Sequence, residues 1–189
     1  ILFWLASIIF WGVSLVRLYQ SYDMAPEILK TMVWDGLDVD DQEGTLASEL
    51  QLEPYHSVEL RGAAKLYLNN GTQQSTILTT NQINSLVYEG VIKAEVRDSV
   101  LYIETSNQIP VDDVMIDFSI TSPYLRKLTV YGASKIETAE NQVLAQPNFA
   151  LDLNGAAEAD LLLNVQTLVI DAKGASKLEL EGQADDVHI

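Results

Sequence analysis

The chain of 189 residues contains no cysteine, which excludes disulfide bonds, thiolate metal sites and a cysteine nucleophile. Histidine is scarce: His56 and His188 are the two present, and neither lies in a His-Glu-x-x-His motif or beside a carboxylate cluster. Basic residues are also few, since 11 lysines and arginines stand against 27 aspartates and glutamates, for a net charge of −16. Such an acidic surface repels phosphate backbones, so we expect no nucleic-acid partner.

The motifs of common catalytic sites are missing as well. Asp112-Asp113 and Asp185-Asp186 are carboxylate pairs, but they stand at expected strand entries, where aspartate favours turns. Ser134 and Ser176 follow Gly-Ala without the Gly-x-Ser-x-Gly elbow or a histidine partner. No phosphate loop or dinucleotide fingerprint occurs. We therefore predict a protein that is not an enzyme, with no cofactor and no metal site.

A long uncharged apolar run is present at the N-terminus, where residues 1–16 read ILFWLASIIFWGVSLV and Arg17-Leu18-Tyr19 follows. As a helix, 16–19 residues span about 24–29 Å, close to the ~30 Å of a bilayer's hydrocarbon core. A signal-peptide core and a buried soluble helix are the alternatives. No small-x-small cleavage site follows the run, and it has no polar face. These features predict a transmembrane helix at residues 1–19.

The sequence gives only weak evidence for which side of the membrane the C-terminal end of this helix faces. Arg17 favours a cytoplasmic C-terminal side under the positive-inside rule, but long domains are translocated largely regardless of charge. We expect the following domain outside the cytoplasm, in the periplasm or at the cell surface.

Residues 20–51 predict an acidic juxtamembrane linker with a short helix around Pro26 to Met32. Asp38, Asp40, Gln42 and Glu49 fit four positions of a calcium-loop pattern, but Glu43 stands where that pattern needs glycine. The linker is therefore interpreted as a solvated acidic spacer.

From Leu52 onward, apolar residues alternate with polar ones in short runs separated by glycine, asparagine and aspartate. This period of two is typical of many short β-strands. The clearest runs are Val58/Leu60, Leu66/Leu68, Val100–Ile103, Val114–Ile120, Leu128/Val130, Leu151/Leu153 and Leu178/Leu180. Three further runs, Ile83–Val87, Ile92–Val96 and Val100–Glu104, predict paired or stacked strands, with Arg97-Asp98-Ser99 as a turn.

One short motif recurs after these runs: a glycine, two small residues, a charged residue and, in most copies, a larger aliphatic one. Its residues include Gly62, then Gly132-Ala133-Ser134, Gly155-Ala156 and Gly174-Ala175-Ser176. The last three glycines are 23 and 19 residues apart. A period near 20 with strand–turn–strand content predicts solenoid coils, most simply a parallel β-helix with these glycines at turns on one side. Glu181-Gly182-Gln183-Ala184 reads as the start of another coil, so we expect further coils after Ile189.

The order of these segments resembles a known family. Tyr55 to Ala63 is similar to its opening strand, Val96 to Ile103 to its next step, and Ile116 to Leu128 followed by Gly132-Ala133-Ser134 to its central signature. The family is the head-GIN domain, also called "putative auto-transporter adhesin", of bacterial envelopes. The resemblance covers residues 52–189 and implies a right-handed parallel β-helix without catalytic residues. The helix at residues 1–19 resembles a phage-shock-protein-C-like membrane segment, on hydrophobicity alone.

Together these features predict a membrane-anchored, non-catalytic binding or adhesion module of the bacterial envelope, which contacts a protein or glycan through its β surface. An envelope-stress sensor is the alternative, and a polysaccharide-processing enzyme on the same fold is a remote one. The tyrosines at 67, 88, 102, 124 and 131 are interpreted as half-buried strand residues, with a sugar-binding face as the alternative. The oligomeric state and the ligand are not indicated by the sequence.

Overall fold

The computed structural model describes residues 46–81, 91–106 and 115–189, and every regular element within these ranges is a β-strand. The all-β class predicted from the alternation is therefore confirmed. In these three ranges, no helix has the length and apolar character needed to cross a membrane. The predicted transmembrane helix at residues 1–19, nearly all of the predicted linker and the predicted strand Ile83–Val87 lie outside the described residues.

The strands are four to six residues long at the start of the chain and longer at its end. They are β1 Leu46–Glu49, β2 Ser57–Gly62, β3 Lys65–Asn69, β4 Ser75–Thr80, β5 Ile92–Arg97, β6 Val100–Thr105, β7 Ile116–Thr121, β8 Lys127–Gly132, β9 Lys135–Thr138, β10 Leu144–Gly155, β11 Glu158–Gly174 and β12 Lys177–His188.

These strands form one mixed sheet in the order β1-β4-β7-β3-β9-β11-β10-β8-β2-β6-β5, with β12 paired to β11. Neighbours in the middle of the order are parallel, whereas β1–β4, β4–β7 and β5–β6 are antiparallel. The predicted pairing of β5 with β6 is confirmed, and its turn places Asp98 and Ser99 at φ of 51° and 60°.

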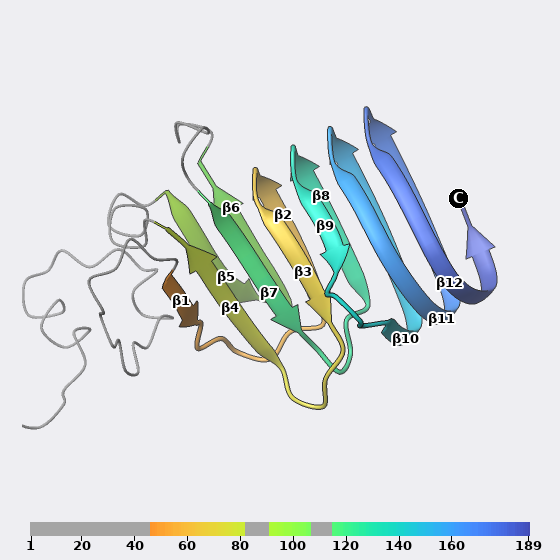
Figure 1. Cartoon of the computed structure of the whole chain (residues 1–189), viewed down its shortest axis with the longest axis horizontal. Helices are drawn as coiled ribbons and strands as arrows, with labels where there is room; N and C mark the ends of the chain where they lie inside the picture. The colour runs from red at the N-terminus through yellow and green to blue at the C-terminus, as the bar shows by residue number, and fades with distance from the viewer. Residues whose placement is uncertain (1–45, 82–90, 107–114) are drawn as a thin grey trace, which may run out of the picture.

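The sheet curls into a half-barrel because β11 belongs to both of its flanks. Residues Glu158 to Asp160 of β11 pair with β9, and Leu163 to Gly174 pair with β10. One flank therefore runs from β1 to β9 and the other from β10 to β5. Figure 1 shows the strands side by side along the long axis of the molecule, with β12 at one end.

The core lies inside the curl and consists of the alternate side chains of each strand. Leu66 and Leu68 of β3 are fully buried and alternate with half-buried residues, and Leu128 and Val130 of β8 are fully buried on either side of Thr129, which is 8 % exposed. Burial of one such side chain contributes about 1.5–3 kcal/mol. The period of two in the sequence therefore decides which side chains line the inside.

The sheet begins earlier in the chain than the sequence predicts. β1, from Leu46 to Glu49, lies within the stretch interpreted as linker, but it pairs antiparallel with β4, and Leu50 behind it is buried. Its sequence, LASE, has no apolar alternation that would mark it as a strand. The open edge of β4 supplies the hydrogen-bonding groups that draw this segment into the sheet.

Candidate functional site

The glycines of the recurring motif lie against one another at one corner of the sheet. Gly62 pairs with Gly132, Gly132 with Gly155, and Gly155 with Gly174. Their φ angles are 112°, 126°, 129° and 91°, a region that favours glycine. A Cβ on Gly155 would lie 2.6 Å from the Gly132 carbonyl oxygen, and one on Gly174 would lie 2.5 Å from that of Gly155. We call these four glycines and the two residues after each the glycine corner.

Backbone hydrogen bonds link successive copies of the glycine corner. The amide after each glycine donates to the carbonyl of the glycine one copy earlier: Ala133 to Gly62 at 3.2 Å, Ala156 to Gly132 at 2.9 Å and Ala175 to Gly155 at 2.8 Å. The small size of the alanines lets the copies approach closely enough for these bonds. The residues singled out in the sequence are thus brought together, and their role there is to join strands.

Hydroxyl groups complete the hydrogen bonding inside the glycine corner. The Ser134 hydroxyl donates to the Gly62 carbonyl at 3.1 Å and accepts from the Ala64 amide at 3.3 Å. Ser134 is buried, so this serine is occupied by backbone groups and is not an exposed nucleophile. Ser176 is partly exposed, and its hydroxyl donates to the Gly155 carbonyl at 3.4 Å.

Sequence reasoning missed one member of this arrangement, Thr105 at the end of β6. Its hydroxyl accepts from the Ala63 amide at 2.8 Å and donates to the Ala63 carbonyl at 3.1 Å. A Cβ on Gly62 would collide with the Thr105 carbonyl and hydroxyl oxygens. No glycine marks this position in the sequence; the only signal is that Thr105 follows the alternating pair Leu101 and Ile103.

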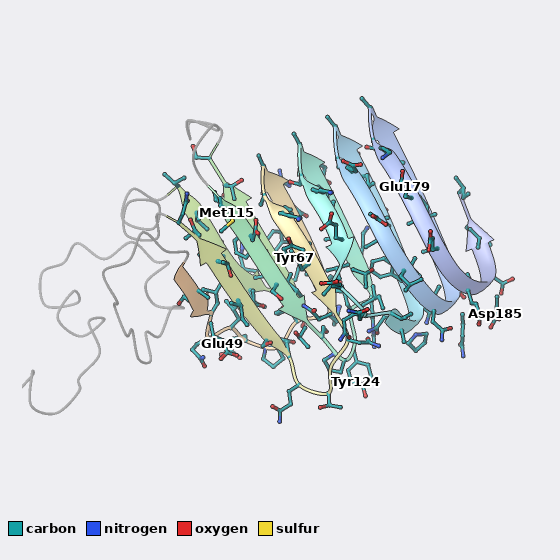
Figure 2. The ribbon with its side chains drawn as sticks, viewed as in Figure 1. Glu49, Tyr67, Met115, Tyr124, Glu179 and Asp185 are labelled. Atoms are coloured by element: carbon teal, nitrogen blue, oxygen red, sulfur yellow. The ribbon has the colours of Figure 1, made fainter. Side chains whose placement is uncertain are left out.

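The outward side of β3, β9, β11 and β12 carries rows of charged side chains in register. Lys65 and Lys135 both contact Glu137, at 3.0 Å and 2.5 Å, and Lys177 contacts Glu158 and Glu179 at 2.9 Å each. We call these six residues the charged ladder. Figure 2 labels Glu179 on β12, at one end of this surface, and Tyr67 on β3, at the other end.

The ion pairs of the charged ladder shift the pKa values of its members. The hydrogen bond from Lys135 lowers the pKa of Glu137, and that from Lys65 adds to it, although partial burial opposes both. Hydrogen bonds to Glu179 and Glu158 raise the pKa of Lys177. These charges satisfy one another on an exposed surface, an arrangement that stabilises register more than it prepares any group for proton transfer.

The remaining candidates from the sequence do not converge. His56 is half-buried beside the Ser57 hydroxyl at 3.0 Å, and His188 is exposed on β12 with Asp185 and Asp186. Within the part of the chain that the structure describes, no three residues of the types that bind metals are grouped. Asp112-Asp113 and all of the calcium-like pattern except Glu49 lie outside the described residues.

A hollow of about 550 Å³ opens at one end of the strands, where the β3–β4 and β7–β8 connections meet the start of β10. We call it the Tyr124 hollow, and it is lined by Asn70, Gly71, Thr72, Pro123, Tyr124 and Ala145. Tyr124, which Figure 2 labels at the lower end of the molecule, is 67 % exposed. Tyr124 is one of the five tyrosines that the sequence analysis considered for a sugar-binding face. Nothing in the sequence indicated that Asn70 and Ala145 would lie beside Tyr124.

A curled all-β sheet with a stacked glycine corner and an exposed charged ladder defines the class of this domain. The family model described as "putative auto-transporter adhesin, head GIN domain" matches residues 54–189, and the chain belongs to that family. The family assigned from the sequence is therefore confirmed, with its boundary two residues after the predicted one at 52. No protein in the curated set matches the chain.

Solved structures share this fold at low sequence identity. One is a putative adhesin from Bacteroides fragilis, with a TM-score of 0.66 and 19 % identity over 77 % of this chain and 66 % of that one. Another is a putative lipid binding protein from Parabacteroides distasonis, with a TM-score of 0.59 and 14 % identity over 76 % of this chain. This chain spans 61 % of the length of that second structure. At such identities the likeness shows the fold.

Proposed function

We propose that the chain is a membrane-anchored, non-catalytic binding module of the adhesin type in the bacterial envelope. Residues 1–19 would hold it in the membrane, and the β domain would lie outside the cytoplasm, in the periplasm or at the cell surface. Membership of the family described as auto-transporter adhesin and the adhesin name of a structure with the same fold support this proposal.

We also propose that the curled sheet is part of a right-handed parallel β-helix. The parallel pairing from β6 through β2, β8, β10 and β11 to β12 supports it, as does the stacking of the glycine corner. In that arrangement, each strand that ends at the glycine corner and the strand that follows it in the chain form part of one coil. Apolar side chains inside each coil are covered by those of the next.

The main structural support for a binding function is the in-register stacking of outward side chains on adjacent strands. The row Asp117, Lys65, Lys135, Glu158 and Lys177 crosses five adjacent strands, and each member is the direct partner of the next. Hydrogen bonds between the strands and ion pairs between the side chains hold these rows in register. A surface that is ordered before binding reduces the entropic cost of meeting an extended polymer, a protein or a glycan.

The location is tested by protease treatment of intact cells of the native host, with an epitope tag placed after Ile189. Digestion from outside, or only after the outer membrane is opened, is the result expected for an extracytoplasmic module. A tag that stays protected until the cells are lysed would place the domain in the cytoplasm and contradict the proposal.

Binding is tested with the purified full chain on beads coated with gelatin or with neutral oligosaccharides. Retention on either kind of bead, above that of a chain unfolded by heat, is the expected result. A chain that is accessible on cells but is retained by neither kind of bead would speak against an adhesive role.

A further inference from the structure

We propose that the Tyr124 hollow binds one or more units of a neutral saccharide, with the ring of Tyr124 as the stacking platform. The proposal rests on the proposed function and goes beyond it, because it places a saccharide in a hollow that shares no residue with the charged ladder. The proposed ligand is a glycan, and binding of a protein instead of a glycan is one of the outcomes that the test distinguishes.

The size and position of the hollow suit a ligand of this kind. Its volume of about 550 Å³ falls in the range of small-molecule pockets, roughly 300–1,000 Å³. Its walls come from two connections, β3–β4 and β7–β8, and from the start of β10, which lie at one end of the strands. Loops supported by a rigid sheet are a common position for binding residues.

The chemistry of the lining favours an uncharged ligand that is rich in hydroxyl groups. The six lining residues that the structure describes are all uncharged, in a chain whose net charge is −16. The amide of Asn70 and the hydroxyl of Thr72 can each both donate and accept hydrogen bonds, as sugar hydroxyl groups do. A charged ligand would find no side chain of opposite sign among the described residues that line the hollow.

Tyr124 differs from the other tyrosines of the described residues in having a free ring face. The rings of Tyr67, Tyr102 and Tyr131 each lie under a cation, Lys65, Arg97 and Arg61 respectively, at 4.6, 4.5 and 4.7 Å. Tyr55 is buried. The ring of Tyr124 carries no such cation and is exposed, so the apolar C–H face of a sugar ring can cover it.

The exposed lining residues are held in place by buried neighbours. Leu125, directly after Tyr124, is 1 % exposed, and the Tyr124 amide donates to the Ser122 hydroxyl at 3.2 Å. The side-chain amide of Gln146, a buried residue next to Ala145, donates to the Ser122 carbonyl at 3.5 Å. A site whose shape is set before binding loses little entropy when the ligand arrives.

A further hydrogen bond ties together the two walls that are most distant in the sequence. The Ala145 amide donates to the side-chain oxygen of Asn70 at 3.4 Å, across 75 residues of chain. This bond uses the oxygen of the Asn70 side chain and leaves its NH₂ group available to a ligand. The hollow is therefore a product of the fold and is absent from any isolated segment.

The test measures binding of the full chain, in a detergent without a sugar head group, to maltohexaose, cellohexaose and N-acetylchitohexaose. Binding of at least one of them to the wild type is expected. Tyr124→Ala should weaken that affinity by about tenfold or more, and Tyr124→Phe should retain most of it. Tyr131→Ala, which removes an exposed tyrosine from the other flank, is the matched control and should leave the affinity unchanged.

Three outcomes separate this proposal from the proposed function. The saccharide site is overturned if the wild type binds none of the three sugars. It is also overturned if Tyr124→Ala binds them with the same affinity as the wild type. If gelatin-coated beads still retain the wild type, the adhesive role stands and its partner is a protein. An unchanged thermal unfolding midpoint of Tyr124→Ala shows that any lost affinity comes from the hollow and not from misfolding.

Discussion

The hydroxyl oxygen of Ser134 lies 3.1 Å from the carbonyl oxygen of Gly62 and 3.3 Å from the amide nitrogen of Ala64. One buried serine therefore satisfies two backbone groups of the neighbouring copy of the glycine corner. In the third copy the same position is Ala157, so this contact is a local addition to the corner and is not repeated in every copy.

Replacing Ser134 by alanine should lower the free energy of unfolding by about 1 kcal/mol, the lower part of the range for a lost buried partner. The cost is limited because the Gly62 carbonyl still accepts from the Ala133 amide at 3.2 Å. Urea denaturation of the full chain measures this change in the free energy of unfolding. Ser176→Ala, at a partly exposed position of the same motif, should change stability by less, and an equal loss in both variants would contradict this reading.

Replacing Gly155 by alanine should destabilise the protein by at least about 1–3 kcal/mol, because a φ of 129° is strained for any residue with a Cβ. The new Cβ would also meet the Gly132 carbonyl oxygen at 2.6 Å, an atom that has no freedom to move away. Thermal unfolding monitored by circular dichroism measures the loss. Asn154→Ala, one residue earlier and half-buried, is the control and should have a far smaller effect. A Gly155 variant as stable as this control would show that the corner is looser than its geometry indicates.

Glu137 should stabilise the fold at neutral pH and cease to do so in acid. Its pKa in the folded state is held below the ordinary value of 4.5 by hydrogen bonds from Lys135 and Lys65. For such a group the stabilisation is present above the unfolded pKa and is lost as the pH falls through the lower, folded pKa. Glu137→Gln should therefore lower the free energy of unfolding at pH 7 by about 0.5–1 kcal/mol, the scale of exposed ion pairs.

This difference between wild type and Glu137→Gln should shrink toward zero in urea titrations carried out well below pH 4.5. Glu140→Gln, on an exposed connection, is the matched charge control. A difference that stays constant with pH would mean that the carboxylate charge of Glu137 is not the source of its effect.

Tyr55 should make the fold sensitive to alkali. Burial raises the pKa of its phenol to about 12 from 10.0, although the hydrogen bond with the Thr76 hydroxyl, at 2.6 Å, acts in the opposite direction. A raised pKa in the folded state means that the stabilisation is complete below pH 10 and is lost as the pH rises toward about 12.

Tyr55→Phe should abolish this part of the alkaline loss and cost about 0.5–1.5 kcal/mol at neutral pH, for the hydrogen bond to Thr76. The near-ultraviolet absorbance of tyrosinate measures the titration directly, and Tyr124→Phe removes an exposed phenol as the control. If the wild type and Tyr55→Phe lose stability in parallel above pH 10, another group is responsible.

Much of the fold follows from short-range patterns in the sequence. Alternation with period two at Leu66/Leu68 and Leu128/Val130 marks strands and their inner faces, because successive side chains of a strand point to opposite sides. The motif at Gly132, Gly155 and Gly174 marks the corner, because a tight approach of backbones with positive φ excludes larger residues. These signals are local, so the strand class, the inner face, the corner and the family can be predicted from the sequence.

The tertiary structure alone sets how distant segments meet. It sets the sharing of β11 between two flanks, the entry of β1 into the sheet and the place of Thr105 beside Gly62. It likewise places Asn70 and Ala145 around Tyr124. Each of these contacts joins backbone groups or loops far apart in the chain, and the pairing that creates them depends on hydrogen-bonding partners that no local pattern of side chains specifies.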